Sequence, residues 1–362
     1  MTARKEKLLG VQYLRAIAAL MVVWFHLYGE IPAYEPFFSV HGWISVPAFR
    51  GGVDIFFVIS GFVMYVSSID SEPLRFLWRR IARIVPLYWS MTLVVVLLSL
   101  AAHSLAKRTE FSWEYLAKSL VFIPYANPGH AGKVFPLLVP GWSLNYEMFF
   151  YAVFAATLLL EHRWRLRTLL TILCALVALG VVLPGSGAIV VTYTSPLLML
   201  FGIGIVLGHF YKRCLADTPY IRNRWIAGFM LSPFVSVSMI LGGFVLLCGP
   251  WSGGAVDLFV SAVLIVAGVV ALDASGMTPH WAFLALLGDA SYSLYLGHTF
   301  VLSTTRILCE HLRLDSAVEF AALSIAGSIA LAILTYRVIE RPTLRLLTQP
   351  LRITKIQEAA TS

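Results

Sequence analysis

Two ionisable residues lie inside the first long apolar run of the sequence. The stretch LRAIAALMVVWFH, residues 14–26, carries Arg15 near its start and His26 at its end, although either side chain is costly in hydrocarbon. Eleven residues bring an α-helix back to within about 20° of the same face and rise about 16 Å. The two side chains therefore share one stripe of a helix, which favours a functional pair. The alternative is that Arg15 extends to the membrane interface and His26 makes a local polar contact.

A cluster of arginines comes next, ahead of the third apolar run. In RFLWRRIARIVPLYW, residues 75–89, Arg80 and Arg83 are three positions apart and share a helical face, with Arg79 beside them. Two guanidinium groups at this spacing suit a bidentate grip on phosphate oxygens. The alternative is a positively charged anchor on the cytoplasmic side or a site for a lipid headgroup.

Two carboxylates lie near the ends of other apolar runs. Asp54 lies in GGVDIFFVISGF, and Glu147 lies in GWSLNYEMFFY, about one turn into the fourth apolar run. With His26 at a similar expected depth, they make an acid–base set facing the outside. The alternative is that each carboxylate only pairs with an arginine such as Arg50 or Arg306.

Aromatic and polar residues recur in SYSLYLGHTF. Ser291, Tyr295 and His298 stand at i, i+4 and i+7, so they share one face of a helix. Tyr295 and His298, together with Trp142 of GWSLNYEMFFY, are candidates for substrate contact. The alternative is that this stripe only packs against its neighbours.

The composition predicts the elements that must position these residues. The chain has 362 residues, of which 59% are hydrophobic and 13% charged, whereas soluble domains average about 25% charged. We predict an all-α, polytopic membrane protein, with an uncleaved first helix and no metal site, because the four cysteines stand far apart. About ten transmembrane helices are expected, near residues 8–28, 51–68, 85–104, 142–160, 168–184, 190–209, 225–247, 254–272, 289–309 and 317–338.

The distribution of basic residues predicts the orientation. Alternate loops collect nineteen Lys and Arg on one side and six on the other, so both termini are predicted to be cytoplasmic. The net charge of +8 then reflects topology rather than nucleic-acid binding. The longest outer loop, residues 105–141, contains FSWEYLAKSLVFIPY, which suits a short interfacial helix. Gly204 and Gly208 have the small-xxx-small spacing that permits close helix packing.

Taken together, these motifs resemble the membrane-bound acyltransferase-3 family. The resemblance rests on the stretches LRAIAALMVVWFH, GGVDIFFVISGF, RRIARIVPLYW, GWSLNYEMFFY and SYSLYLGHTF and on the closing ERP at residues 340–342. It covers nearly the whole chain, and GWSLNYEMFFY is most similar to the exopolysaccharide-modifying branch called ExoZ. The resemblance implies one transmembrane domain over residues 1–345, a cytoplasmic tail over 346–362, and a place in the bacterial inner membrane.

The resemblance also implies an activity. It implies transfer of an acyl group, by analogy acetyl, from cytoplasmic acyl-CoA to a hydroxyl of an extracytoplasmic polysaccharide or lipid-linked glycan. Some members carry a soluble hydrolase-like domain after the membrane part, and without one the membrane domain is expected to handle the acceptor itself. The rival is a proton-coupled transporter or flippase of a polysaccharide precursor, with the same residues as a proton relay; a structural scaffold would not need buried ionisable groups.

Residue roles follow from the matched motifs. The resemblance implies a catalytic role for His26, as general base or as transient acyl acceptor, both of which stay open. Asp54 and Glu147 occupy motif positions, and either is expected to fix the tautomer of His26. Contact with CoA is implied for Arg15, Arg80 and Arg83, while Arg79 is a close neighbour of that motif.

Overall fold

The structure is a computed structural model, and it describes residues 8–30, 46–101, 111–185, 187–214, 232–249, 254–314 and 316–348. Within these ranges the regular elements are all helices, joined by turns and loops, and the one extended pairing is an isolated bridge between Ala126 and Val134. The long helices are α1 (Leu9–Glu30), α3 (Gly52–Ser68), α4 (Pro73–Ala101), α6 (Trp142–Leu158), α7 (His162–Val182), α9 (Leu198–Cys214), α11 (Pro233–Cys248), α12 (Ala255–Ala274), α14 (Ser291–Leu312) and α15 (Ala317–Thr335).

Each expected transmembrane range overlaps one of these helices. Seven helical stretches of the described residues are long and apolar enough to cross a membrane. The all-helical, multi-pass membrane class is therefore confirmed, whereas a total of about ten spans and the cytoplasmic placement of both termini stay predictions. The termini, residues 1–7 and 349–362, lie outside the described residues. Helix α16 (Arg341–Thr348) runs across the expected domain boundary at residue 345.

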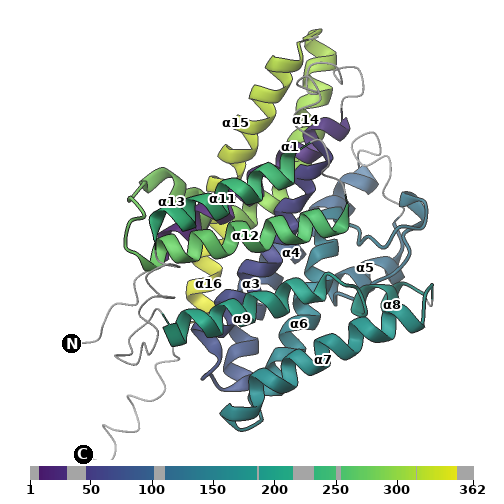
Figure 1. Cartoon of the computed structure of the whole chain (residues 1–362). Coiled ribbons are helices and arrows are strands. Elements are labelled where there is room, and N and C mark those ends of the chain that lie inside the picture. Colours follow the sequence, from purple (N-terminus) through teal and green to yellow (C-terminus); the bar gives the residue numbers. More distant parts are fainter. Residues whose placement is uncertain are drawn as a thin grey trace, which may run out of the picture.

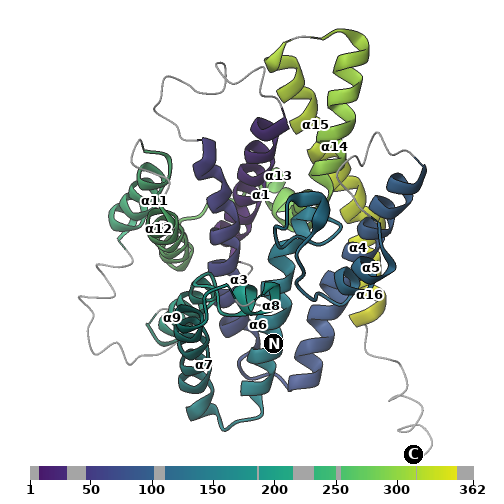
Figure 2. The same cartoon turned by 90° about the vertical axis from the view of Figure 1, so that its right-hand side faces the viewer.

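Helices α1 and α3 lie at the centre of the molecule. Figure 2 shows them between the α11–α12 pair on one side and α4, α14 and α15 on the other. The α14–α15 hairpin extends beyond the other helices at the top of Figure 1. α1 packs against α3, α12, α13 (Ala282–Asp289) and α14, so residues on several of its faces are enclosed by protein.

The first turn of α1 is held by a distant carboxylate. The Asp273 side chain accepts hydrogen bonds from the backbone N–H groups of Gly10 (2.7 Å) and Val11 (3.0 Å). These donors have no partner within the helix, and a negative charge there also complements the helix dipole. The start of α1, one turn before Arg15, is thereby fixed to the end of α12.

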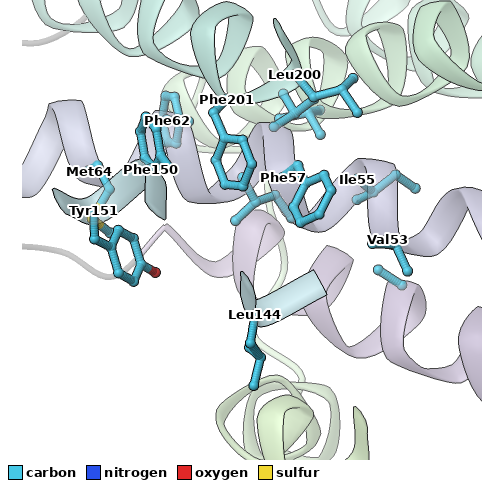
Figure 3. Close-up of a cluster of buried hydrophobic side chains, with 14 of the residues drawn as sticks. Val53, Ile55, Phe57, Phe62, Met64, Leu144, Phe150, Tyr151, Leu200 and Phe201 are labelled. Carbon is cyan, nitrogen blue, oxygen red and sulfur yellow. The ribbon is translucent and has the colours of Figure 1, made fainter. Parts of the chain in front are cut away.

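Glycines bring α3 and α9 into backbone contact, as the small-xxx-small spacing predicts. A Cβ at Gly204 would stand 2.1 Å from the Val58 carbonyl oxygen, and one at Gly61 would stand 2.1 Å from that of Phe201. Aromatic rings fill the space beside this contact. Phe57 and Phe201 have ring centroids 4.5 Å apart, and Figure 3 shows them within the central apolar cluster.

Helix α4 begins twelve residues before the expected third span. The hydropathy of residues 75–83 is lowered by four arginines, which moved the predicted start to residue 85. Phe76, Ala82 and Ile84 are nevertheless buried, so one face of this segment packs against protein and the helix extends to Pro73. Arg80 and Arg83 therefore stand on the helix itself.

The loop between α4 and α6 contains the expected short helix, α5 (Trp113–Leu120). Ser112 caps it by accepting a hydrogen bond from the Glu114 backbone N–H at 3.2 Å. Trp89 of α4 donates from Nε1 to the Leu120 carbonyl at 2.8 Å. The described part of the loop is thereby attached to α4.

Candidate active site

A cavity lies between α1, α3, α4, α6 and α14. Its volume is about 110 Å³, and its wall includes Arg15, Arg80 and Arg83 together with the carboxylate of Glu147. Tyr295 and Ser291 of α14 complete the polar side. Three guanidinium groups from two helices thus converge on one internal space, although Arg15 is 65 or more positions from the other two in the sequence.

Arg15 and Arg80 are held at the cavity by different kinds of contact. Arg15 donates from Nη2 to Ser291 Oγ at 2.8 Å. The Arg80 guanidinium lies over the rings of Phe76 and Tyr151, 5.5 and 5.9 Å from their centroids, in cation–π geometry. Such stacking orients the planar group while leaving its in-plane N–H donors available for a ligand.

Glu147 accepts hydrogen bonds from two other residues of the cavity wall. Its Oε1 accepts a hydrogen bond from Ser60 Oγ at 3.1 Å and another from the Tyr151 hydroxyl. The negative charge of this carboxylate attracts the guanidinium groups of Arg80 and Arg15. Glu147 stands one helical turn before Tyr151, so the carboxylate, the ring and the guanidinium of Arg80 form one connected group.

A buried carboxylate near the end of the described chain also lies beside the arginines. Glu340 ends a π-helical turn (Tyr336–Glu340), is 7% exposed, and accepts a hydrogen bond from Ser293 Oγ at 2.6 Å. Its strongest electrostatic attraction is to Arg83, followed by Arg15. The closing ERP motif contained this residue, but nothing in the sequence indicated that it faces the arginines.

His26 lies beyond the cavity and meets a second histidine. It does not line the cavity wall. His26 Nδ1 stands 2.9 Å from the Val22 carbonyl oxygen and 3.3 Å from Nε2 of His298, which is fully buried. Tyr295 lines the cavity one turn before His298, with ring centroids 6.4 Å apart. The α14 stripe expected from the sequence therefore connects the cavity to His26.

The remaining predicted site residues do not line the cavity. Asp54 is buried in the first turn of α3 and interacts electrostatically with Arg50, while its neighbour Val53 lines the cavity. Arg79 points to the α3–α4 turn, where Nη2 donates to Ser71 Oγ at 2.7 Å. Trp142 packs edge-on against the rings of Phe57 and Tyr146.

Two hydroxyl groups that the sequence did not single out also belong to the site. Ser143 Oγ lies 2.8 Å from the Tyr295 hydroxyl, which donates to the Pro140 carbonyl oxygen. Tyr292 lines the cavity and donates to the Ile84 carbonyl oxygen at 2.8 Å. Both hold the α14 wall against neighbouring elements. In the described part of the chain, no group of three or more His, Cys, Asp or Glu residues is arranged for a metal ion.

Comparison with known proteins identifies relatives across most of the chain. The family model described as "Acyltransferase domain" matches residues 8–337. The "Exopolysaccharide production protein ExoZ" of Rhizobium meliloti is 37% identical over 297 residues, which cover 81% of this chain and 89% of that protein. No solved structure matches the chain.

Two further relatives are more distant. The "Acyltransferase MdmB" of Streptomyces mycarofaciens is 26% identical over 82% of this chain and 81% of its own length. The "Peptidoglycan O-acetyltransferase OatA" of Listeria monocytogenes is 26% identical over 92% of this chain, which corresponds to 55% of that protein.

Proposed function

Because this chain belongs to the acyltransferase family and is an O-acyltransferase, we propose that it transfers an acyl group from acyl-CoA to a glycan hydroxyl across the membrane. The main observation behind this proposal is the cavity that Arg15, Arg80 and Arg83 line together. Three cations that line one cavity suit a donor that bears phosphate groups. Membership of an enzyme family favours this activity over the transporter alternative.

The size of the cavity limits what it holds. Pockets that enclose a whole drug-sized ligand measure about 300–1,000 Å³, and this cavity measures about 110 Å³. It therefore takes one part of the donor, while the rest lies toward the cytoplasmic end of α4. Arg80 and Arg83 bind phosphate oxygens, and Arg15, held by Ser291, orients the arm that carries the thioester.

His26 supplies the base at the other end of α1. The acceptor oxygen attacks the thioester carbonyl carbon, and His26 takes the hydroxyl proton. The carbon–sulfur bond then breaks, and the same proton passes to the departing sulfur, so that CoA leaves as the thiol. Transient transfer of the acyl group to His26 is the competing route. Asp54 and Glu147 remain candidate acid–base groups, and the contacts of Glu147 at the cavity support a role beside the donor as well.

The acceptor and the location follow from the relatives by analogy. ExoZ is named for exopolysaccharide production and OatA for acetylation of peptidoglycan. We therefore propose acetyl as the acyl group, a polysaccharide or lipid-linked glycan as the acceptor, and the bacterial inner membrane as the location. Trp142 and Tyr295 are proposed to contact the acceptor or the acyl chain.

Purified protein in liposomes tests this function. Acetyl-CoA is supplied on one side and a glycan acceptor on the other, and release of free CoA is measured. Acceptor-dependent release in the wild type, and its loss in His26→Ala with acetyl-CoA binding retained, is the expected result. A well-folded His26→Ala protein with near-normal transfer would overturn the role of His26. Acceptor movement without acetyl-CoA would overturn the activity itself.

A further inference from the structure

Two histidines on helices far apart in the sequence meet through one nitrogen of each ring. His298 Nε2 on α14 lies 3.3 Å from His26 Nδ1 on α1, and the ring centroids are 4.9 Å apart. His298 is fully buried and His26 is half-buried. Because His298 is the more buried of the two, its place in the fold suits action through His26 better than contact with substrate.

Backbone carbonyls determine which nitrogens carry protons. His26 Nδ1 faces the Val22 carbonyl oxygen at 2.9 Å, and His298 Nδ1 faces that of Leu294 at 3.2 Å. A carbonyl oxygen only accepts hydrogen bonds, so Nδ1 is the donor in both rings. In a neutral imidazole the other nitrogen, Nε2, then carries the lone pair.

The contact between the rings follows from this assignment. The lone pair on His298 Nε2 faces the N–H at His26 Nδ1, which also donates to the Val22 carbonyl oxygen. One N–H shared between two acceptors is a three-centre hydrogen bond, which accounts for the longer of the two distances. His26 is thus held in the tautomer whose Nε2 is the basic nitrogen.

We propose that His298 is a positioning residue that fixes the tautomer and the ring orientation of His26. The inference rests on the proposed function, in which His26 is the base. It assigns to a buried neutral imidazole the part that a carboxylate plays in a Ser-His-Asp triad. We had expected Asp54 or Glu147 in this part, but the hydrogen bonds of Glu147 go to Ser60 and Tyr151.

The proton balance of the transfer is consistent with this arrangement. When His26 Nε2 takes the hydroxyl proton, the ring becomes a cation with an N–H at both nitrogens, and the N–H at Nδ1 remains bonded to His298. His298 gains and loses no proton, because its own N–H stays on the Leu294 carbonyl oxygen. A neutral acceptor suits a fully buried position, since an unpaired charge there would be costly.

Nitrogen NMR of the wild-type protein tests the tautomer without relying on activity. The full chain is labelled with ¹⁵N-histidine in nanodiscs, and the His26 signals are those lost in His26→Gln. At neutral pH we expect Nδ1 of His26 to be protonated and Nε2 to be unprotonated. The opposite tautomer in the wild type would overturn the inference.

Substitutions of His298 test the consequence for catalysis. His298→Leu removes the acceptor, whereas His298→Gln places an amide oxygen near the position of Nε2. We expect His298→Leu to lower kcat by about 10–100-fold at unchanged KM for acetyl-CoA, because one of the two acceptors at His26 Nδ1 is lost, and a ring that turns or takes the other tautomer does not present a basic Nε2 to the acceptor hydroxyl. His298→Gln is expected to restore most of kcat. His311→Gln, on an exposed residue of the same helix, is the matched control.

The outcomes separate this inference from the proposed function. If His26→Ala is inactive but His298→Leu keeps the wild-type kcat and tautomer, the positioning role is wrong and the base survives. If the Leu and Gln variants lose kcat equally while the His26 tautomer is unchanged, His298 only packs, and the inference is again wrong. If His26→Ala retains full transfer, the proposed function fails whatever tautomer the NMR spectrum shows.

Discussion

Arg15 and Ser291 join the N-terminal halves of α1 and α14 through a hydrogen bond of 2.8 Å from Nη2 to Oγ. Farther along the same two helices, His26 meets His298. From the first contact to the second, the residue numbers increase on both helices. Helices α1 and α14 therefore lie side by side and run in the same direction. The candidate donor cavity and the candidate base therefore lie along one seam between two helices.

Removal of the Ser291 hydroxyl is expected to weaken donor binding. Ser291→Ala deprives the Arg15 guanidinium of its acceptor, and a hydrogen bond to a charged group contributes about 1.5–3 kcal/mol. We expect KM for acetyl-CoA to rise about tenfold with kcat nearly unchanged. Ser328→Ala is the control, because the buried Ser328 hydroxyl has no hydrogen-bond partner within the described residues. An equal KM in both variants would contradict the assignment.

The arginine pair on α4 is expected to dominate donor affinity. Arg80→Gln combined with Arg83→Gln removes two of the three cavity cations, and acetyl-CoA affinity should fall on the order of tens-fold or more. Isothermal titration with purified protein measures this change. Arg75→Gln, on an exposed residue of the same helix, should leave affinity unchanged. Unchanged affinity in the double variant would return both arginines to a topological role.

Glu147 is expected to stabilise the fold, because its carboxylate accepts hydrogen bonds from two hydroxyl groups. Glu147→Ala leaves the Ser60 and Tyr151 hydroxyls without their acceptor, at a cost of roughly 1–3 kcal/mol for each buried group left unpaired. Glu147→Gln keeps an acceptor oxygen and should lose less. Thermal unfolding in detergent compares the two variants, and equal losses would show that these hydrogen bonds contribute little.

Hydropathy and residue spacing predicted most of the helical framework. Apolar windows located a helix at every expected range, because a membrane span requires a long apolar run. The start of α4 was wrong because four arginines lower the hydropathy of a segment whose other face is buried by Phe76 and Ile84. Burial by neighbouring helices depends on residues far away in the sequence, so the hydropathy of a local window does not predict it.

The candidate site was predictable along one helix but not between helices. The Arg15–His26 stripe on α1 and the Ser291–His298 stripe on α14 follow from helical periodicity alone. Their contact with each other depends on how the two helices pack. The sequence places Glu147 and His26 at a similar depth in the membrane, which groups them together. In the structure, Glu147 lines the arginine cavity, and its carboxylate contacts Ser60 and Tyr151 there.

The glycine contact between α3 and α9 gives a prediction about stability. Gly204→Ala would place a methyl group 2.1 Å from the Val58 carbonyl oxygen, so the helices must separate or the protein must unfold. We expect a loss of at least about 1–3 kcal/mol, as for other overpacked cores, measured as a lower melting temperature. Gly242→Ala on α11 is the control, since its Cβ would meet nothing within 4 Å. Equal melting temperatures would contradict the close packing.

The orientation of the chain is the last prediction, and the proposed mechanism depends on it. Cysteines are introduced one at a time at Lys133, in the long loop before α6, and at Arg163, at the start of α7; both residues are exposed. The background carries serine in place of the four native cysteines. Because α6 separates the two sites, we expect an impermeant thiol reagent to label only the Lys133→Cys variant in cells with a permeabilised outer membrane. The Arg163→Cys variant should be labelled only after the inner membrane is opened. The reverse pattern would place Arg80 and Arg83 outside, away from cytoplasmic acyl-CoA, and would refute the direction of transfer.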